Sequence, residues 1–382
     1  MTLYEIAKPT DPKALLTSYG VRSGGVAIMA DKMELLYVHI HDLKTPAANI
    51  LKQDALSIGA DLAVPGGVIT CEVEWVDALL IATRKQMRIL AKKELAQPFG
   101  LKALAQGLSR LLKERIFPTR IMGVINANDD SFYSGSRFQA DEAIAQIEQM
   151  IAQGAQIIDI GAVSSRPGAD PVSASLERER IRPICDTIAR KKLHEKALFS
   201  IDSYTPAVVE YALEHGFELI NDITGARDTA LIDLAVKYEV GLCIMHMQGT
   251  PQTMQADPQY EDVTAEVDAF FAERIAECEE RGLPRERIVL DPGIGFGKTL
   301  EHNLTLLHNL RQFTHHGCEV LVGASRKSMI DQILPTPVEA RLPGTLAIHL
   351  KALDHGASIL RVHDVAEHVQ SVAVWKKLAG RS

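Results

Sequence analysis

The sequence has few cysteines and no pattern of paired metal ligands. Its five cysteines stand apart, with no C-x-x-C pair, and their number is odd. A disulfide framework uses an even set of cysteines, so we expect reduced thiols, as in a cytoplasmic protein. The segments HDL, HMQ and VHD lack paired ligand spacing, so no zinc site is expected.

The sequence also lacks a long apolar run and an excess of basic residues. No apolar stretch approaches the roughly 18 residues of a membrane-spanning helix, and the N-terminus MTLYEIAKPTDPK has no signal pattern. The formal net charge of −8 argues against a nucleic-acid-binding protein, which is normally basic. We therefore expect a soluble cytoplasmic protein without membrane or nucleic-acid partners, although a local basic pocket for an anionic substrate remains compatible with this charge.

From residue 119 onward, short apolar runs alternate with stretches of helical spacing. The expected strands are 120–126, 157–162, 198–202, 219–224, 241–247, 288–293, 319–325 and 359–364. Each is followed by a helical pattern, such as QADEAIAQIEQMIAQG after the first strand. Continuous apolar strands alternating with helices indicate a parallel sheet covered by helices. Eight such units predict a closed (β/α)₈ barrel rather than an open doubly wound sheet.

The first 116 residues do not follow this alternation. The segments 33–41, 55–64 and 75–83 have the composition of strands or short helices, and the pattern from Lys85 to Glu114 is helical, interrupted by QPFG. The chain of 382 residues is longer than a usual single core. We therefore expect a small α+β domain over residues 1–116 and the barrel over residues 117–382.

Polar side chains stand at the end of nearly every predicted barrel strand. In (β/α)₈ enzymes the catalytic groups come from the C-terminal ends of the strands and the loops that follow. These positions hold Asn126, Asp202, Asn221, Asp222, His246, Asp291, Ser325, Arg326, Lys327, Arg361 and His363, and the loop after the second strand adds Ser165 and Arg166. Helix capping explains a few Asp or Ser residues, but not this set of basic side chains, histidine and carboxylates. We therefore predict a functional rim.

One group of rim residues consists of hydrogen-bond donors together with a candidate metal ligand. The donors are Ser165, Arg166, Arg361 and His363. Arginine side chains bind phosphate oxygens bidentately, so this group indicates a subsite for a phosphate-like anion. Asn126 offers a hard oxygen for Mg²⁺, which commonly takes one or two protein oxygens together with phosphate oxygens and waters.

The other group consists mostly of acceptors. Asp202, Asn221 and Asp291 suit a flat heterocycle that presents amino and ring N–H donors along one edge. Lys327 adds a donor for a carbonyl group of the same ligand, or for a second ligand.

Three other features have structural interpretations. GIGFGKT (293–299) lacks the first glycine of a phosphate-binding GxxxxGK loop, so its glycines are expected to allow a close approach of the backbone. His315 and His316 are expected at the surface of the opposite end of the barrel. Cys243 lies within a predicted strand, where buried packing is the expected role.

The barrel region resembles dihydropteroate synthase of the folate pathway. The segments that carry the resemblance are FSIDSYTP, INDI, IMHMQGTPQTMQ, LDPGIGFGKT, VGASRKSMI and LRVHDV, in this order. The resemblance implies a transferase that condenses (7,8-dihydropterin-6-yl)methyl diphosphate with 4-aminobenzoate, whose place sulfonamides take, to 7,8-dihydropteroate and pyrophosphate. The first domain, including AANILKQDALSIGADLAV (47–64), resembles an extension of some bacterial members.

The resemblance also implies roles for individual residues. The pterin-binding positions are Asp202, Asn221, Asp291 and Lys327. The pyrophosphate positions are Ser165, Arg166, Arg361 and His363, with Asn126 as the Mg²⁺ ligand. The surroundings of the aminobenzoate are Phe132, Pro167, Phe296, Ser325 and Lys327. Catalysis is assigned to Asn126, Arg166, Lys327, Arg361 and His363. This division implies that Arg361→Ala removes most turnover and spares the binding of a free pterin.

Two loops depart from the family pattern N-V-T-P-D-S-F-S-D-G and from its later Gly-Glu pair. Asn128-Asp129 replaces Thr-Pro, Ser134 replaces the second aspartate, and Ala162-Val163 replaces Gly-Glu. We expect these changes to alter the handling of aminobenzoate and sulfonamides. A barrel that binds pterins without catalysis, and a methyltetrahydrofolate–corrinoid methyltransferase, are the alternatives, although the latter has no use for SRK at 325–327. The family also implies a homodimer.

Overall fold

The computed structural model describes residues 2–6, 9, 11–113, 115, 117–127, 136–163, 172–250 and 253–379. The chain forms two compact units. One comprises Met1–Glu114 together with Lys376–Ser382, and the other comprises Arg115–Trp375. The division expected between residues 116 and 117 remains a prediction.

The N-terminal unit is a small α+β fold, as expected. Its antiparallel sheet has the strand order β1-β3-β2. The strands are β1 Leu35–Lys44, β2 Asp61–Ala63 and β3 Trp75–Thr83. The helices are α1 Pro12–Ser18, α2 Ser23–Met33, α3 Thr45–Ser57, α4 Arg84–Lys93 and α5 Leu101–Leu111, with a short 3₁₀ helix Glu94–Ala96.

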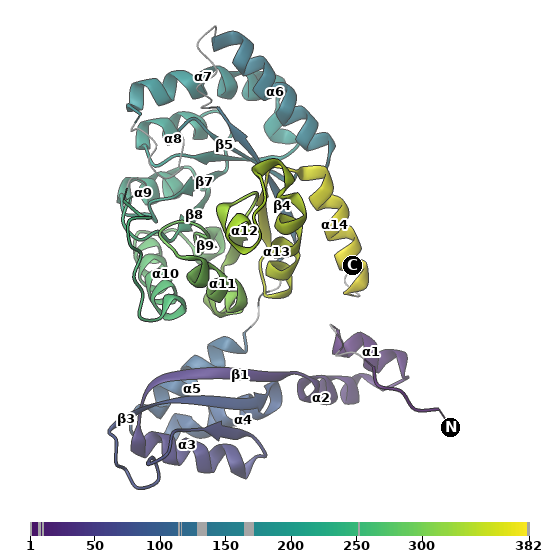
Figure 1. Cartoon of the computed structure of the whole chain (residues 1–382), viewed down its shortest axis with the longest axis vertical. Coiled ribbons are helices and arrows are strands. Elements are labelled where there is room, and N and C mark those ends of the chain that lie inside the picture. The colour runs from purple at the N-terminus through teal and green to yellow at the C-terminus, as the bar shows by residue number, and fades with distance from the viewer. Residues whose placement is uncertain are drawn as a thin grey trace. The chain divides into compact units, whose positions relative to one another are not determined.

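This sheet buries one face and exposes the other. Along β3 the buried residues alternate with exposed ones, because successive side chains of a strand point to opposite faces. The buried residues, such as Leu80, join Leu51 of α3 and Met87 of α4 in one apolar cluster. The helices therefore cover one face of the sheet (Figure 1), and the opposite face carries Tyr37 and Trp75 in exposed positions.

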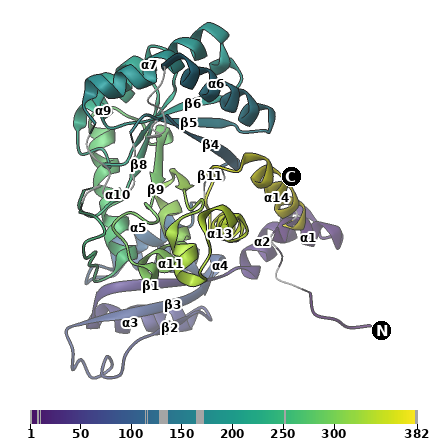
Figure 2. The same ribbon diagram turned by 45° about the horizontal axis from the view of Figure 1, so that its top comes forward.

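The second unit confirms the predicted (β/α)₈ barrel (Figures 1 and 2), with eight parallel strands closed into a ring. The strands are β4 Arg120–Asn126, β5 Ile157–Gly161, β6 Leu198–Asp202, β7 Leu219–Asp222, β8 Gly241–Met245, β9 Ile288–Asp291, β10 Glu319–Val322 and β11 Ile359–Val362. The helices are α6 Ser136–Ala152, α7 Ala174–Lys191, α8 Pro206–Leu213, α9 Thr229–Lys237, α10 Val263–Glu280, α11 Leu300–His308, α12 Ser328–Ile333, α13 Leu342–Asp354 and α14 Val365–Leu378. Within the residues described, no helix has the length and apolar character needed to cross a bilayer.

An apolar layer fills the interior of the barrel, with one side chain from each strand. It comprises Met122, Ile157, Leu198, Leu219, Cys243, Val289, Leu321 and Ile359. Cys243 is fully buried in this layer, which confirms its predicted packing role. A packed interior of this kind is a floor rather than a pore.

Two residues further along each strand, side chains face the interior again. These positions hold Val124, Asp159, Ser200, Asn221, Met245, Asp291, Gly323 and Arg361. Four of the eight carry a carboxylate, an amide or a guanidinium group, in contrast to the apolar layer below. The strand period therefore places a polar layer directly above the floor, at the C-terminal end of the barrel.

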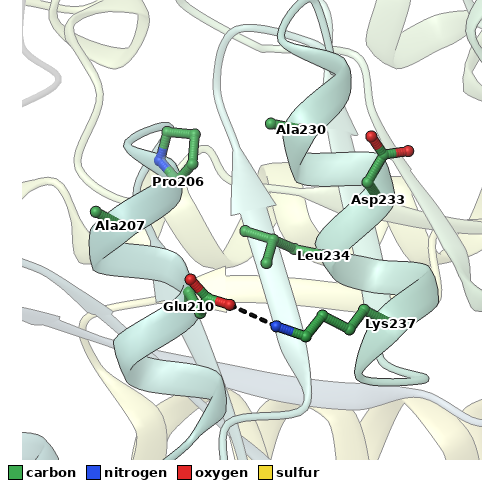
Figure 3. A pocket seen from close by; sticks show the side chains of 7 residues that line it. All are labelled: Pro206, Ala207, Glu210, Ala230, Asp233, Leu234 and Lys237. Carbon is green, nitrogen blue, oxygen red and sulfur yellow. Dashed lines mark hydrogen bonds and ion pairs between the residues drawn. The ribbon is translucent and has the colours of Figure 1, made fainter.

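A groove of about 330 Å³ lies elsewhere, between α8 and α9 (Figure 3). An ion pair of 2.7 Å joins Glu210 of α8 to Lys237 of α9 within it. The residues that line this groove include none of the predicted rim residues, so it is not part of the site described next.

Candidate active site

Arg361 connects three strands across the barrel. Its Nε donates to Asp159 Oδ2 on β5 at 2.7 Å, and its Nη2 donates to Asp202 Oδ2 on β6 at the same distance. The Asp159 side chain is fully buried and that of Asp202 is 11% exposed. The donor and acceptor groups predicted from the sequence are therefore not separate, because Arg361 of the donor group bonds directly to Asp202 of the acceptor group.

Asp159 is a candidate site residue that the sequence analysis missed. Its Oδ2 also accepts a hydrogen bond of 2.9 Å from the Asn221 side-chain amide. It thereby orients two of the predicted rim residues, Asn221 and Arg361. Asp159 lies two residues before the end of its strand, and the alternation of side chains along that strand was the available signal.

The strand register brings the remaining rim positions together. Asn126, Gly161, Asp202 and Asn221 are successive partners on four neighbouring strands. A Cβ atom at Gly161 would lie 3.3 Å from the Cβ of Asp202, so glycine leaves room for that carboxylate. Asn126 is exposed at the end of β4.

Burial dominates the electrostatics of the acceptors. It raises the pKa of Asp202 to about 7, although Arg361 acts in the opposite direction. The pKa of Asp291 is also raised by burial, with Lys327 opposing. Burial lowers the pKa of Lys327 to about 8, against the effect of Asp291. The site therefore holds several ionisable groups whose charges depend on their neighbours, which is common in active sites.

Lys327 and Phe296 form the other side of the site. The Lys327 ammonium lies 4.4 Å from the centroid of the Phe296 ring and donates to the Ile294 carbonyl. Phe296 packs against an apolar cluster of Ile223, Met245, Met247 and Met254. This arrangement places an aromatic ring beside a cation.

The glycine-rich loop after β9 confirms the predicted close approach of two backbones. A Cβ at Gly293 would lie 2.0 Å from the His246 carbonyl oxygen, and one at Gly297 would lie 2.7 Å from the Gln248 carbonyl oxygen. Both glycines have positive φ, of 66° and 60°. The loop can therefore pack against the end of β8 only with glycine at these positions.

Lys298 fixes the same loop from within. Its Nζ donates to His246 Nδ1 at 3.0 Å, to the His246 carbonyl at 3.2 Å and to the Phe296 carbonyl at 2.9 Å. Burial lowers the pKa of His246 to about 3, which keeps its imidazole neutral and able to accept. The rim histidine His246, which was assigned to neither the donor nor the acceptor group, is therefore a support for the loop that carries Phe296.

Two further rim residues have structural partners. Arg326 makes two hydrogen bonds to the Asp364 carboxylate, of 3.0 and 2.6 Å, so its guanidinium faces the β11–α14 loop. Asp222 accepts from the backbone N–H groups of Thr224 and Ala226, at 2.7 and 2.6 Å. Both residues hold rim loops, and neither belongs to the acceptor or donor group.

Ser325 and His363 lie together at the rim. The Ser325 hydroxyl lies 2.9 Å from His363 Nδ1 and accepts from the His363 backbone N–H at 3.3 Å. His363 is exposed, whereas Ser325 is buried. The contact joins a predicted aminobenzoate residue to a predicted pyrophosphate residue.

A chain of two buried histidines supports this part of the rim. The Ala324 N–H donates to His349 Nε2 at 3.1 Å, so His349 Nδ1 carries the proton that it shares with His368 Nε2 at 2.8 Å. His368 Nδ1 then donates to the Asp364 carbonyl at 2.6 Å. Burial lowers the pKa of both rings, so the chain is built from neutral imidazoles.

Other predictions have mixed outcomes. Phe132, Ser165, Arg166 and Pro167 lie outside the described residues. The expectation that His315 and His316 lie at the surface is wrong, because His316 is buried and both rings contact the Asp268 carboxylate of α10. The helix therefore supplies a partner that the sequence did not indicate.

Comparisons with known proteins agree with this geometry. The sequence model of the family described as pterin binding enzyme matches residues 122–363. The chain is 44% identical to the dihydropteroate synthase of Haemophilus influenzae, over 68% of this chain and 94% of that protein. The chain belongs to the dihydropteroate synthases.

Two further comparisons cover different lengths of the chain. The structure of Yersinia pestis dihydropteroate synthase with a sulfonamide drug complex superposes with a TM-score of 0.64 at 37% identity, over 69% of this chain and 95% of that one. A Helicobacter pylori protein, named bifunctional dihydropteroate synthase/dihydropteroate reductase, is 40% identical over 98% of this chain and 99% of its own. The dihydropteroate synthase is therefore a transferase with an N-terminal extension that this relative shares, and neither alternative function is favoured.

We predict that His246 and His349 contribute stability to the barrel that is lost on acidification. The folded-state pKa of His246 and His349 lies below the ordinary value of about 6.5, so only the unfolded chain takes up these protons. The stabilisation by each histidine is complete above about pH 6.5 and is lost as pH falls below that value, by about 1.4 kcal/mol per pH unit while the folded ring stays neutral. For His246 this loss continues toward about pH 3. Urea unfolding between pH 7 and pH 5 measures this slope.

The variant His349→Gln provides the control. It removes one titrating ring and keeps an acceptor for the Ala324 N–H. Its slope should be shallower by about 1.4 kcal/mol per pH unit. An unchanged slope would show that His349 takes up a proton in the folded state.

Proposed function

We propose that the rim condenses the pterin diphosphate with 4-aminobenzoate through one shared cation, Arg361, that joins the pterin pocket to the pyrophosphate subsite. The observation that supports this proposal is the pair of hydrogen bonds from Arg361 to Asp159 and Asp202. These bonds use two of the five N–H groups of the guanidinium. The guanidinium is thus held in a fixed orientation beside residues that are proposed to bind the pterin.

The pterin would lie on the acceptor set. Asp202, Asn221 and Asp291 supply the acceptors and an amide along one edge of the ring, and Lys327 supplies a donor. Asp159 Oδ1 is fully buried and has no hydrogen-bond partner among the described residues, so it would add negative charge and a free acceptor to this pocket. Buried carboxylates favour the positive charge that develops on the methylene carbon as its C–O bond breaks.

The leaving pyrophosphate would take the electron pair of that bond. Arg361 and His363 would stabilise its charge, with Ser165 and Arg166 assigned to the same subsite by resemblance. The amine nitrogen of 4-aminobenzoate then forms the new C–N bond and loses a proton. No strong general base is needed, because an aromatic amine loses this proton readily after attack.

Mg²⁺ fits one described residue of this site. Asn126 ends β4 in an exposed position and shares the register row of Asp202, and its amide oxygen is a hard ligand. One protein oxygen suits Mg²⁺ when phosphate oxygens and waters complete its coordination. The ion, when bound, would neutralise part of the diphosphate charge.

The aminobenzoate would pack on Phe296, near Ser325 and Lys327. Phe296 offers an aromatic face, and Lys327 lies on that face as a cation for the carboxylate. The solved Yersinia pestis relative was obtained with a sulfonamide drug, and we propose that sulfonamides occupy this same place here.

The synthase assay tests this proposal directly. The full chain, incubated with the pterin diphosphate, Mg²⁺ and labelled 4-aminobenzoate, should form labelled dihydropteroate. Removal of Mg²⁺ by a chelator should lower turnover, and Asn126→Ala should raise the Mg²⁺ concentration needed for half-maximal rate. Pterin binding without product would instead support a barrel that only binds pterins. Turnover that does not change when Mg²⁺ is removed would contradict the proposed role of the metal ion.

Two substitutions separate the shared cation from a simple donor. Arg361→Ala leaves two buried carboxylates without their cation, so it should destabilise the fold by about 3–5 kcal/mol and weaken pterin binding together with turnover. His363→Ala touches neither carboxylate and should lower kcat about 10²-fold with pterin binding retained. Calorimetric titration with a free pterin measures the pterin affinity of both variants. Unchanged pterin affinity in Arg361→Ala would restore the division expected from the sequence.

A second candidate activity concerns the N-terminal unit. The Helicobacter pylori relative with synthase and reductase in its name aligns over nearly the whole chain, whereas the Haemophilus influenzae synthase aligns over 68% of it. We therefore propose that this chain also reduces dihydropteroate. A hydride would add to the C6 carbon of the N5=C6 bond and a proton to N5, with a reduced nicotinamide or a reduced flavin as the donor.

This second activity is measured with the full chain, dihydropteroate and each donor, by the formation of tetrahydropteroate. His363→Ala should lose the synthase rate and keep the reductase rate, because the change is confined to the barrel rim. Absence of reduction with both donors would leave the chain with the synthase activity alone.

The homodimer and the cytoplasmic location also remain proposals. Exposed apolar side chains at Ile333, Leu334 and Val338, in and after α12, support a subunit interface formed by the later helices. Sedimentation of the full chain measures the oligomeric state. The five free cysteines support a reducing compartment.

A further inference from the structure

Three potential ligand atoms meet on the exposed face of the N-terminal sheet. His39 Nε2 lies 3.2 Å from His41 Nδ1, and His41 Nδ1 lies 3.3 Å from Asp77 Oδ2. His39 Nε2 lies 3.5 Å from the same carboxylate oxygen. The three side chains are 52%, 45% and 54% exposed, so the group is open to solvent.

The backbone of β1 creates this arrangement. His39 and His41 point to the same face because they are two residues apart on a strand. Ile40 pairs with Ala78 and Leu43 with Val76, so His41 and the extra residue Asp42 both lie opposite Asp77. Bulges of this kind redirect side chains and are frequent beside functional sites.

The bulge also orients the carboxylate. Asp42 adopts a φ of 50°, and its N–H donates to Asp77 Oδ1 at 3.2 Å. This bond occupies one carboxylate oxygen and directs the other toward the two imidazoles. The Asp42 N–H and the nearby histidines lower the pKa of Asp77, so its carboxylate stays ionised at neutral pH.

The distances between the three atoms match the edges of a metal tetrahedron. Zinc–nitrogen and zinc–oxygen bonds of about 2.0–2.2 Å, at tetrahedral angles, put neighbouring ligand atoms about 3.3–3.5 Å apart. The observed values are 3.2, 3.3 and 3.5 Å.

Hydrogen bonds alone do not satisfy the same triangle. A neutral His41 Nδ1 either donates its proton or accepts one, so it cannot serve Asp77 as a donor and His39 as an acceptor at once. If His41 Nδ1 instead donates its proton to His39 Nε2, the lone pair of His39 Nε2 also faces Asp77 Oδ2, and neither of these two atoms has a proton to donate. One cation at the centre of the triangle satisfies all three atoms.

We propose that His39, His41 and Asp77 bind a divalent transition-metal ion of the zinc class, with the fourth position open to solvent. Two neutral imidazoles and one carboxylate are a common ligand set for such ions, and an open position is the arrangement of reactive rather than purely structural sites. The sequence segment HDL showed only one of these ligands, because the second histidine precedes it and the carboxylate lies on another strand.

A second cluster of the same residue types serves as a comparison. Among the described residues, the other group with three potential ligands is Asp268, His315 and His316. There His315 Nε2 and His316 Nε2 both approach Asp268 Oδ1, at 2.9 and 3.0 Å. Two N–H donors on one carboxylate satisfy these contacts without an ion, and the cluster is largely buried.

Metal binding by the full, chelator-treated chain tests the proposal. Calorimetric titration with Zn²⁺ should show one tight equivalent, and Co²⁺ should give the visible absorption of a tetrahedral site. His41→Ala and Asp77→Asn should each weaken Zn²⁺ binding by more than about 100-fold, since loss of even an outer partner costs about 10- to 100-fold. Unchanged far-ultraviolet circular dichroism and thermal unfolding of both variants would show that the N-terminal unit is folded.

Two matched variants control for other ligands. His215→Ala removes a histidine that lies 3.2 Å from a single carboxylate, that of Asp186 on the barrel, and should leave Zn²⁺ binding intact. Cys71→Ser removes an exposed thiol of the N-terminal unit and should also leave it intact. The proposal is overturned if the wild-type chain takes up no Zn²⁺, if His41→Ala and Asp77→Asn bind it normally, or if Asp268→Asn abolishes binding.

Discussion

The barrel rim depends on one guanidinium that balances two buried carboxylates. Asp159 and Asp202 lie on neighbouring strands above an apolar floor, where water cannot compensate their charge. Arg361 reaches both from β11 and holds them in one network with Asn221. In the proposed reaction the carboxylates would bind the pterin and the guanidinium would stabilise the leaving group, so recognition and charge stabilisation would share the same atoms. The acceptor pocket could not be kept at this depth without that cation.

Polar networks within the protein hold the loops of the rim. Lys298 fixes the glycine-rich loop to β8, and Asp222 closes the turn before α9. The chain of His349 and His368 connects the Ala324 backbone to the loop that begins α14. Each network satisfies buried backbone groups that would otherwise be costly. The loops that carry Phe296 and His363 are therefore held in place by hydrogen bonds. A site that works by preorganised charge requires such fixed positions.

The N-terminal unit follows a different design from the barrel. Its sheet is packed by helices on one face and exposed on the other, and the bulge in β1 turns two histidines toward a carboxylate on that exposed face. The polar groups of the barrel lie in a largely buried layer above its apolar floor, whereas His39, His41 and Asp77 of this unit are exposed to solvent. The two units thus carry two separate clusters of polar side chains on one chain.

The sequence by itself determined the eight strands, the helices between them and most of the rim, including Asp202, Asn221, Asp291, Lys327 and Arg361. These follow from the local alternation of apolar and polar residues, which depends only on near neighbours in the chain. The tertiary structure decided which polar groups meet. In the folded chain Asp159 bonds to Arg361, and His316 is buried against Asp268. Arg326 and His246 hold rim loops. Asp77 lies beside His39 and His41. Such pairs arise from strand register and from helices far apart in sequence, and periodicity along a single segment carries no information about them.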